Sequence, residues 1–304
     1  MREATLPFGM VDGRVVPIAR PAPRRTDTRF GDFDVVSPLA RGGMGGVYLA
    51  VDSRSGERVA LKVLDSQFAN HPEVVERLYA EHHLASRAQH PGLITIREAR
   101  RTTDDVPYLV MEYLDGQTLG ALTERQELEQ PVVVAIAAQL AAALAALHAV
   151  GVVHCDVKHD NVFVLDARHG LKVKLIDFGV SRTVDEPPRD DAAIAGTPWC
   201  MAPEQWQGRP EPASDVYALG CLLYDLTTGS APFDGSLPEL MIAHLEQRPA
   251  RPSWLVKMPM QLERLILRAL AKEPAHRPAM AELALELAAL ADAMAPQRDL
   301  RAAG

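Results

Sequence analysis

The chain is poor in cysteine. Cys155, Cys200 and Cys221 are the only three among its 304 residues. Three is too few, and an odd number, for a disulfide framework, and no two of them stand in the C-x-x-C spacing of structural zinc sites. Cysteine usage of this kind is typical of a reducing compartment, so we expect a cytoplasmic protein.

Excess positive charge and a targeting segment are also missing. Lys and Arg number 32 against 40 Asp and Glu, which gives a formal net charge of −8. This balance disfavours a broadly basic nucleic-acid-binding protein, and we expect no nucleic-acid partner. The first residues contain no apolar stretch of the kind that a secretory signal needs. Apolar residues make up 47% and charged residues 24%, which is the usage of an ordinary folded protein.

One apolar run, residues 132–153, is nearly long enough to cross a bilayer. Alanine dominates it, Gln139 and His148 interrupt it, and Leu or Ile stands at positions 136, 140, 144 and 147. That spacing places the large apolar side chains on one face of a helix. We therefore expect a helix of the protein core, and no membrane partner.

The composition changes along the chain. Residues 1–30 carry six Arg against three acidic residues, with a predicted tight hairpin at Asp12-Gly13 and an extended Pro-rich linker after it. We interpret them as a leader, either a mobile segment or a strand pair lying on the main body, and less readily as a docking motif. Residues 30–107 are rich in strand patterns around one helix at 71–89, and 108–113 form a further strand. After Pro131 the pattern is mainly helical, which predicts a small β-rich lobe followed by a larger helical lobe.

A glycine-rich turn lies between the first two strong strand patterns. It runs from Ala40 to Val47 and has glycine at 42, 43, 45 and 46. Because glycine has no Cβ, backbone N–H groups in such a turn can approach a triphosphate closely. A glycine cluster is also the ordinary composition of a hairpin turn. The turn lacks the Gly-Lys-Ser/Thr ending of a P-loop, which disfavours a Walker-type fold.

Lysine is scarce, and one lysine stands in an apolar strand. The sequence Val59-Ala60-Leu61-Lys62 places an ammonium among buried-type residues, while Arg is the default cation elsewhere. A compact point charge at this position indicates a negative partner, although lysines at strand edges also reach solvent. Glu81, on the following helix, is the expected partner.

Two polar segments follow the alanine-rich helix. The first is His154-Cys155-Asp156-Val157-Lys158-His159-Asp160-Asn161, and the second, after a short hairpin, is Leu175-Ile176-Asp177-Phe178-Gly179. An Asp can accept a hydroxyl proton and a Lys can stabilise a moving phosphoryl group. An Asn and a second Asp can hold Mg²⁺, which prefers oxygen ligands. Any one of these residues alone would be an ordinary loop residue.

Together, in order and spacing, these motifs resemble the signature set of the protein kinases. The chain is similar to bacterial eukaryotic-like (Hanks-type) Ser/Thr protein kinases over about residues 31–292. Gly196-Thr197-Pro198-Trp199-Cys200-Met201-Ala202-Pro203-Glu204 resembles the end of the activation segment, and Asp215 resembles the anchor of the family's buried helix. Arg277 stands where the family pairs an arginine with the glutamate that is Glu204 here. The resemblance implies a bilobal α+β fold, with an N-lobe of about 31–112, a C-lobe of about 116–292 and a tail at 293–304.

The resemblance also implies a role for individual residues. The phosphate-covering loop would be Ala40, Gly42, Gly43 and Gly45, and the adenine would lie between Val47 and Ala60. Lys62, paired with Glu81, would contact the α- and β-phosphates. Met111 would be the gatekeeper residue, with Glu112 and Leu114 as the hinge.

In the catalytic segments, Asp156 would be the catalytic base and Lys158 its phosphate-facing helper. Asn161 and Asp177 would be the metal ligands. The implied cofactors are ATP and Mg²⁺ or Mn²⁺. The implied partners are protein substrates with Ser or Thr, because Lys158 and Thr197 resemble the Ser/Thr-specific branch.

Three positions depart from the family pattern. Ala40 replaces the first loop glycine, which predicts altered nucleotide affinity, and His159 replaces the usual Pro, which loosens the catalytic loop. Cys155 replaces the Arg that grips a phosphate on the activation loop. Residues 186–195 also lack Ser and Thr, and Asp190 and Asp191 stand where phosphosites usually lie. We therefore predict a kinase that does not need activation-loop phosphorylation.

Other interpretations stay open at this point. A pseudokinase scaffold that binds nucleotide and regulates a partner would explain the same three departures. A small-molecule phosphotransferase of kinase-like fold would share the catalytic-loop motif but not Asp177-Phe178-Gly179 or Ala202-Pro203-Glu204. Cys155 and Cys200 could form a redox switch, although free cysteines near packed loops usually act as small apolar residues. With no sensor segment visible, regulation would come from the leader or from a partner protein.

Overall fold

The computed structural model describes residues 29–165, 170–187 and 196–295. The predicted leader hairpin and linker, Asp190 and Asp191, and most of the predicted tail lie outside these residues. The chain divides into two compact units. The first contains the residues up to Gln126 together with 149–154 and 159–186, and the second contains 127–148, 155–158 and 187 onward.

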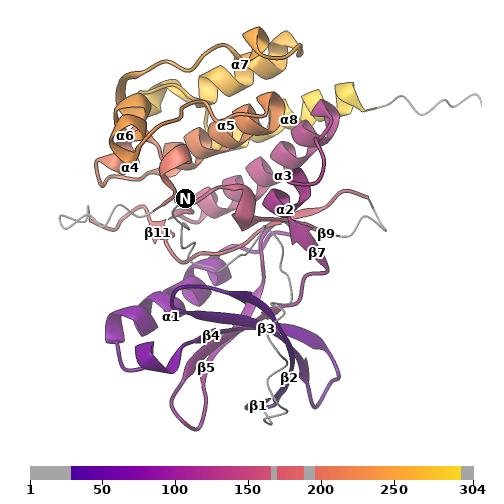
Figure 1. Cartoon of the computed structure of the whole chain (residues 1–304), viewed down its shortest axis with the longest axis vertical. Helices are drawn as coiled ribbons and strands as arrows, with labels where there is room; N and C mark the ends of the chain where they lie inside the picture. Colours follow the sequence, from indigo (N-terminus) through magenta and orange to yellow (C-terminus); the bar gives the residue numbers. More distant parts are fainter. Residues whose placement is uncertain (1–28, 166–169, 188–195, 296–304) are drawn as a thin grey trace, which may run out of the picture. The chain divides into compact units, whose positions relative to one another are not determined.

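The first unit is built on an antiparallel sheet of six strands in the order β1-β2-β3-β4-β6-β5 (Figure 1). Its strands are β1 (Arg29–Phe30), β2 (Phe33–Arg41), β3 (Gly45–Asp52), β4 (Arg58–Leu64), β5 (Ile96–Arg101) and β6 (Pro107–Glu112). Their β-branched and aromatic residues suit a half-buried pleated surface. One face forms a core that contains Phe33, Leu61, Tyr108 and Val110.

Helix α1 (Pro72–Arg87) packs against β5 and β6 (Figure 1). Pro72 starts the helix at a position where its missing N–H costs nothing. The predicted apolar stripe is confirmed, because Val75, Leu78, Leu84 and Ala85 are all buried. Glu81 lies on the same buried stripe, so the helix carries one carboxylate inward among apolar neighbours.

Short strands complete the first unit. β7 (Gly116–Thr118), β9 (Val162–Leu165) and β10 (Val173–Leu175) form a three-stranded sheet, and β8 (Val152–Val153) pairs with β11 (Arg182–Thr183). The remaining elements are α2 (Leu119–Thr123), η1 (Ser66–Phe68) and η2 (His159–Asn161). The hairpin predicted between the two polar segments is therefore present as β9 and β10.

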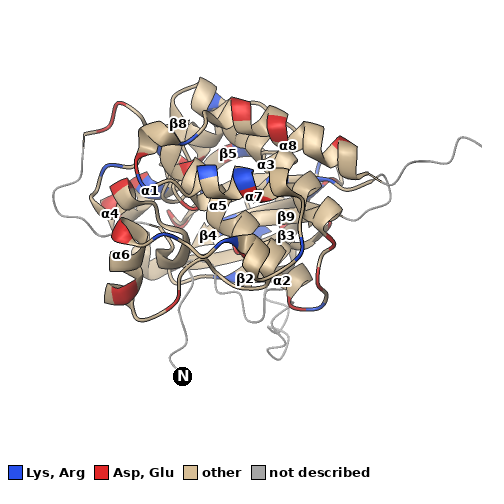
Figure 2. Cartoon of the chain, turned by 90° about the horizontal axis from the view of Figure 1, so that it is seen from above, with Lys and Arg blue, Asp and Glu red and all other residues tan. Residues whose placement is uncertain are grey.

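The second unit is helical (Figure 1). Its helices are α3 (Gln130–Ala149), α4 (Pro203–Trp206), α5 (Pro212–Thr228), α6 (Leu237–Glu246), α7 (Met260–Ala269) and α8 (Met280–Met294), with the short turns η3 (Pro198–Cys200), η4 (Pro252–Trp254) and η5 (Pro274–His276). Figure 2 shows how acidic and basic residues are spread over these helices.

Helix α3 is the predicted alanine-rich helix. Ile136, Leu140, Leu144 and Leu147 are all 0% exposed, which confirms the predicted core face. The helix is also long and apolar enough to cross a membrane, and half of its most apolar window is buried within the protein. The expected absence of a membrane partner stays a prediction.

Helix α5 is the central helix of the second unit and packs against α4, α7 and α8. Glu211 and Ser214 form a reciprocal capping box at its start, and Gly229 ends it in a left-handed conformation, φ 76°. A Cβ on Gly220 would lie 2.8 Å from the Cβ of Ala269, so glycine lets α5 and α7 approach closely.

The predicted α+β fold with a β-rich part and a helical part is confirmed. The division by contacts falls elsewhere than the predicted 31–112 and 116–292. Residues 159–186 group with the sheet unit because β9 pairs with β7 and with β10, and because Leu93 forms a parallel bridge with Leu175. Local sequence patterns carry no information about such long-range pairing.

Candidate active site

Lys62, Glu81 and Asp177 meet in the first unit. The Lys62 ammonium donates to both oxygens of Glu81, at 2.7 and 2.5 Å, and to Oδ1 of Asp177 at 3.3 Å. Strand β4 supplies the lysine, α1 supplies the glutamate, and Asp177 follows β10. The structure thus brings together the predicted Lys62–Glu81 pair and adds a carboxylate 115 residues from the lysine.

The charge of this cluster is unbalanced. Burial disfavours the ammonium, but the carboxylates of Asp177 and Glu81 outweigh it and raise the pKa of Lys62. Burial raises the pKa of Glu81 to about 7, with Lys62 opposing the shift and Asp177 adding to it. Two carboxylates facing one ammonium form a buried site with excess negative charge, which fits the approach of a further cation.

Asn161 and Asp177 lie at the same end of the β9–β10 hairpin. Val162 and Leu175 are cross-strand partners, and the Ile176 N–H donates to the Asn161 carbonyl at 2.8 Å. Asn161 therefore directly precedes one strand and Asp177 closely follows the other. Their oxygen donors are the ligands that Mg²⁺ and Mn²⁺ prefer, and Mg²⁺ usually keeps several waters besides one or two protein ligands. The residues present fit a divalent cation.

The glycine-rich turn is closed by backbone contacts. The Gly42 N–H donates to the Gly45 carbonyl at 2.7 Å, and the Asp65 N–H donates to the Met44 carbonyl at 2.9 Å. A Cβ on Gly45 would lie 2.0 Å from the Val63 carbonyl oxygen, whereas a Cβ on Gly43 would meet nothing within 4 Å. Gly45 is thus required by the approach of β3 to β4, and the cradling of phosphates by this turn stays a prediction.

The positions predicted to face adenine lie on the same sheet. Ala60 pairs with Met111 across β4 and β6, and both side chains are buried. Val47 pairs with Ala40 on β2 and with Lys62 on β4. Ala40 therefore stays in the β2–β3 pairing, directly after a register irregularity that begins at Pro38.

At the predicted hinge, both the backbone and the carboxylate of Glu112 bind Thr95. Its N–H donates to the Thr95 carbonyl at 3.0 Å, and its carboxylate accepts from the Thr95 N–H at 2.7 Å. Lys174 Nζ binds the same carboxylate at 2.6 Å and the Leu93 carbonyl at 2.9 Å. Leu114 lies two residues after Glu112 and is half-buried. The sequence reasoning missed Lys174, although its place among so few lysines was a signal.

Asp156, Lys158 and Thr197 form a second cluster, in the second unit. The Thr197 hydroxyl donates to Asp156 Oδ1 at 2.6 Å, and Lys158 Nζ lies 2.9 Å from Thr197 Oγ1 and 2.8 Å from Asp156 Oδ2. Asp156 and Lys158 are 5% and 4% exposed. A buried carboxylate that binds both a hydroxyl and an ammonium has the arrangement that a general base needs.

The backbone of Cys155, the residue before Asp156, is fixed by hydrogen bonds to two side chains. It adopts a left-handed conformation with φ 66°, which is unusual for a residue with a side chain. Its N–H donates to Asp215 Oδ1 at 2.8 Å, and its carbonyl accepts from Gln205 Nε2 at 2.7 Å. Asp215 is 0% exposed and its other oxygen lies 2.8 Å from His148 Nε2. Gln205 was not singled out by the sequence, because nothing local links it to Cys155.

The cysteines of the second unit are buried. Cys155, Cys200 and Cys221 are free thiols, and the Cys200 Sγ donates to the Thr197 carbonyl at 3.4 Å. Burial raises the pKa of the Cys200 thiol well above its usual range. A thiol held in the neutral form reacts slowly, so the geometry favours a packing role over a redox switch.

The pair expected from the resemblance at the end of the activation segment is present. Arg277 binds both carboxylate oxygens of Glu204, and Ser214 Oγ donates to the same carboxylate at 2.5 Å. This network joins α4, α5 and the segment after η5.

Comparisons with known proteins show the family of the chain. The protein kinase domain family matches residues 33–286. Serine/threonine-protein kinase Pkn1 of Myxococcus xanthus is 39% identical over 276 residues, which are 88% of this chain and 39% of the relative. PknA of Mycobacterium tuberculosis is 36% identical over 265 residues, 84% of this chain and 60% of the relative. PrkC of Bacillus subtilis is 34% identical over 257 residues, 83% of this chain and 39% of the relative. The chain thus spans between 39% and 60% of the length of these relatives.

Proposed function

The chain belongs to the protein kinase domain family, and from that membership we propose that it is a Ser/Thr protein kinase. It would transfer the γ-phosphoryl group of ATP to Ser and Thr hydroxyls of proteins. The observation that carries the proposal is the formed Lys62–Glu81 ion pair, with Lys62 Nζ 2.5 Å from Oε2 of Glu81. Phosphoryl transfer in protein kinases requires this pair to be in place.

Asp156 is the general base of this proposal. A hydroxyl oxygen fits at hydrogen-bond distance from its carboxylate, since Thr197 Oγ1 lies 2.6 Å from Oδ1. A substrate hydroxyl held in that way gives its proton to Asp156 while its oxygen forms a bond to the γ-phosphorus. The bond from that phosphorus to the oxygen bridging to the β-phosphate breaks, and ADP leaves with the electron pair. Lys158 stabilises the negative charge on the transferred group.

Asn161 and Asp177 are the residues that would hold Mg²⁺ or Mn²⁺. A bound divalent cation neutralises phosphate charge. In the first unit Lys62, oriented by Glu81, binds the α- and β-phosphates, and the hinge at Glu112 and Leu114 binds the adenine through backbone groups. The Glu112 N–H already donates to Thr95, which leaves the carbonyl as the group proposed to meet the base.

We further propose that activity does not depend on activation-loop phosphorylation. Cys155 provides no guanidinium to bind a phosphoryl group, and buried side chains fix its backbone instead. Thr197 already contacts Asp156 in the unphosphorylated chain. Protein treated with phosphatase should retain its activity. Loss of activity on that treatment, with recovery on phosphorylation of a residue between 180 and 197, would contradict the proposal.

The decisive experiment measures phosphate transfer from γ-labelled ATP with Mg²⁺ to the protein itself or to a basic test protein. Wild type is compared with Asp156→Asn and Lys62→Met, both checked for folding by circular dichroism. Label that both variants lose supports the kinase. A scaffold that binds nucleotide without chemistry is the second candidate, favoured by Ala40 in place of the first loop glycine. It predicts no label, together with a rise in thermal stability on addition of ATP.

The setting of this activity is also a proposal. We place it in the cytoplasm, with protein substrates and a regulatory protein partner, and without nucleic acid or membrane. The cysteine usage and the net charge of −8 support that setting.

A further inference from the structure

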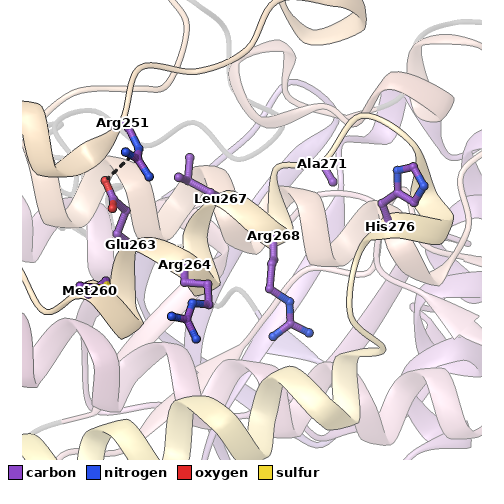
Figure 3. Close-up of a pocket in the computed structure, with 8 residues that line it drawn as sticks. All are labelled: Arg251, Met260, Glu263, Arg264, Leu267, Arg268, Ala271 and His276. Carbon is purple, nitrogen blue, oxygen red and sulfur yellow. Dashed lines mark ion pairs between the residues drawn. The ribbon is translucent and has the colours of Figure 1, made fainter.

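A basic groove lies along helix α7 of the second unit (Figure 3). Its volume is about 470 Å³, and its lining includes Arg251, Arg264 and Arg268 together with Met260 and Leu267. Figure 3 shows Arg264 and Arg268 extending from the same side of α7, one turn apart. None of these residues belongs to the two clusters assigned to catalysis, so the groove needs an explanation of its own.

Two of the three arginines already face carboxylates of this chain. Arg268 binds Glu282 and Glu286 on α8, each at 2.7 Å, and Arg251 lies 3.9 Å from Glu263. Figure 2 shows that α8 carries acidic residues. Arg264 differs, because no carboxylate of the described residues lies within ion-pair distance of it.

Helix α8 places no carboxylate within ion-pair distance of Arg264. One turn beyond the two glutamates on the same face, the residues of α8 are Ala289 and Leu290, and no full turn of the helix precedes Glu282, because α8 begins at Met280. Like charges four residues apart on a helix repel, so Arg264 beside Arg268 is a local cost. An external anion between the two guanidinium groups would remove that cost.

The groove also has an apolar side. Met260 is 74% exposed, and Leu267, the second apolar side chain of the lining, is half-buried. Exposed Met beside Arg is a composition that is enriched at the centres of protein interfaces. A free phosphate would use the arginines but not these apolar side chains.

We propose that the α7 groove is a docking site for an acidic peptide segment of a partner protein. Carboxylates of the segment bind the Arg264 guanidinium and the side of the Arg251 guanidinium that faces away from Glu263. An apolar side chain of the segment packs on Met260 and Leu267. The proposal does not rest on catalysis, so it is tested by binding alone and stands or falls separately from the kinase activity.

The test is fluorescence anisotropy on the full chain. The probe is a fluorescein-labelled peptide of four Glu-Glu-Leu repeats, and the matched peptides carry Lys or Gln in place of Glu. The protein variants are Arg264→Glu, which reverses an exposed charge and should fold, and Met260→Ser. Arg209→Glu is the control, because Arg209 is exposed and lies outside the groove. Asp156→Asn is included to show that binding is independent of the chemistry.

We expect the acidic peptide to bind wild type, Arg209→Glu and Asp156→Asn equally. Arg264→Glu should weaken binding by about tenfold, and added salt should weaken it for every protein that binds. Met260→Ser should weaken binding less and leave the salt dependence unchanged. Equal affinity for the Lys peptide, unchanged affinity of Arg264→Glu, or absence of binding would each overturn the proposal. Binding to phosphatidylserine vesicles without binding to the peptide would also overturn it, in favour of a membrane surface.

Discussion

Arg277 donates to both carboxylate oxygens of Glu204, at 2.7 and 2.9 Å, and its side chain is completely buried. The two residues are 73 positions apart. Arg277 also donates to the backbone carbonyls of Ala213, Ala271 and Lys272, so all its donor nitrogens are used. The pair therefore joins α4 to the segment that follows η5.

Replacing Arg277 with Met should destabilise the protein strongly. The change leaves the buried Glu204 carboxylate with Ser214 Oγ as its remaining side-chain donor among the described residues, and it removes the Arg277 donors of three carbonyls. Removing one member of a buried ion pair costs about 3–5 kcal/mol of unfolding free energy. Urea unfolding measures the loss, with Arg209→Met, at an exposed arginine, as the control. A loss below that of the control would show that the pair does not hold this part of the fold.

His244 should make the protein sensitive to acid. The imidazole is 0% exposed, lies 3.0 Å from the Tyr217 hydroxyl through Nδ1, and packs on Phe233 with ring centroids 5.0 Å apart. Burial, with the nearby Lys272 ammonium adding to it, lowers the pKa of His244 to about 4. The unfolded chain, with an ordinary pKa, therefore binds the proton first as the pH falls. Stability that is present above about pH 6.5 is lost as the pH falls to about 4.

The contribution is about 3 kcal/mol, because each pKa unit corresponds to about 1.4 kcal/mol. It is measured as the difference in urea unfolding free energy between pH 7 and pH 4.5, in wild type and in His244→Gln. The variant has no imidazole to protonate, so its stability should depend less on pH in this window. An identical pH dependence in both proteins would refute the assignment to His244.

Local sequence patterns predicted the Lys62–Glu81 pair but could not predict the contacts of Gln205 and Lys174. The helix spacing of Val75, Leu78 and Leu84 places Glu81 on the buried stripe of α1, so a charged residue there pointed to a buried partner, Lys62. The contacts of Gln205 with the Cys155 carbonyl and of Lys174 with Glu112 join residues 50 and 62 positions apart. They depend on how loops and hairpins pack, and residue type alone does not encode that packing.

The cysteines show the same limit. Their number indicated reduced thiols, but their reactivity depends on burial, and burial follows from the packing of α5 and η3. Cys200 and Cys221 are buried, and burial raises the pKa of both thiols far above the usual range. A glycine-like conformation at Cys155 was not predictable, because that residue has a side chain.

The buried thiols should resist modification. At neutral pH they stay protonated, and the thiolate is the reactive form. We expect iodoacetamide to label Cys200 and Cys221 only after unfolding, as measured by mass spectrometry with and without denaturant. After treatment with peroxide, wild type and Cys155→Ser should be equally active in the phosphate-transfer assay. Rapid labelling of the folded protein, or an intramolecular disulfide after peroxide, would restore the redox switch between Cys155 and Cys200.

Two glycines of the turn from Ala40 to Val47, Gly43 and Gly45, should differ in how much stability the protein loses when each is replaced by alanine. In Gly45→Ala the new Cβ would lie 2.0 Å from the Val63 carbonyl oxygen, which belongs to the backbone of β4. The strands must move apart where the turn begins, and overpacking against backbone costs about 2 kcal/mol or more. In Gly43→Ala the Cβ meets nothing within 4 Å, so the fold should keep its stability.

Thermal unfolding and ATP titration separate the two effects. Gly45→Ala should lower the melting temperature and weaken ATP binding together, because β3 carries both the turn and Val47. Gly43→Ala should leave the melting temperature unchanged, so any loss of ATP affinity in this variant reports on the approach of the backbone to the phosphates. If Gly45→Ala were as stable as wild type, the close approach of β3 to β4 would not be what requires glycine at this position.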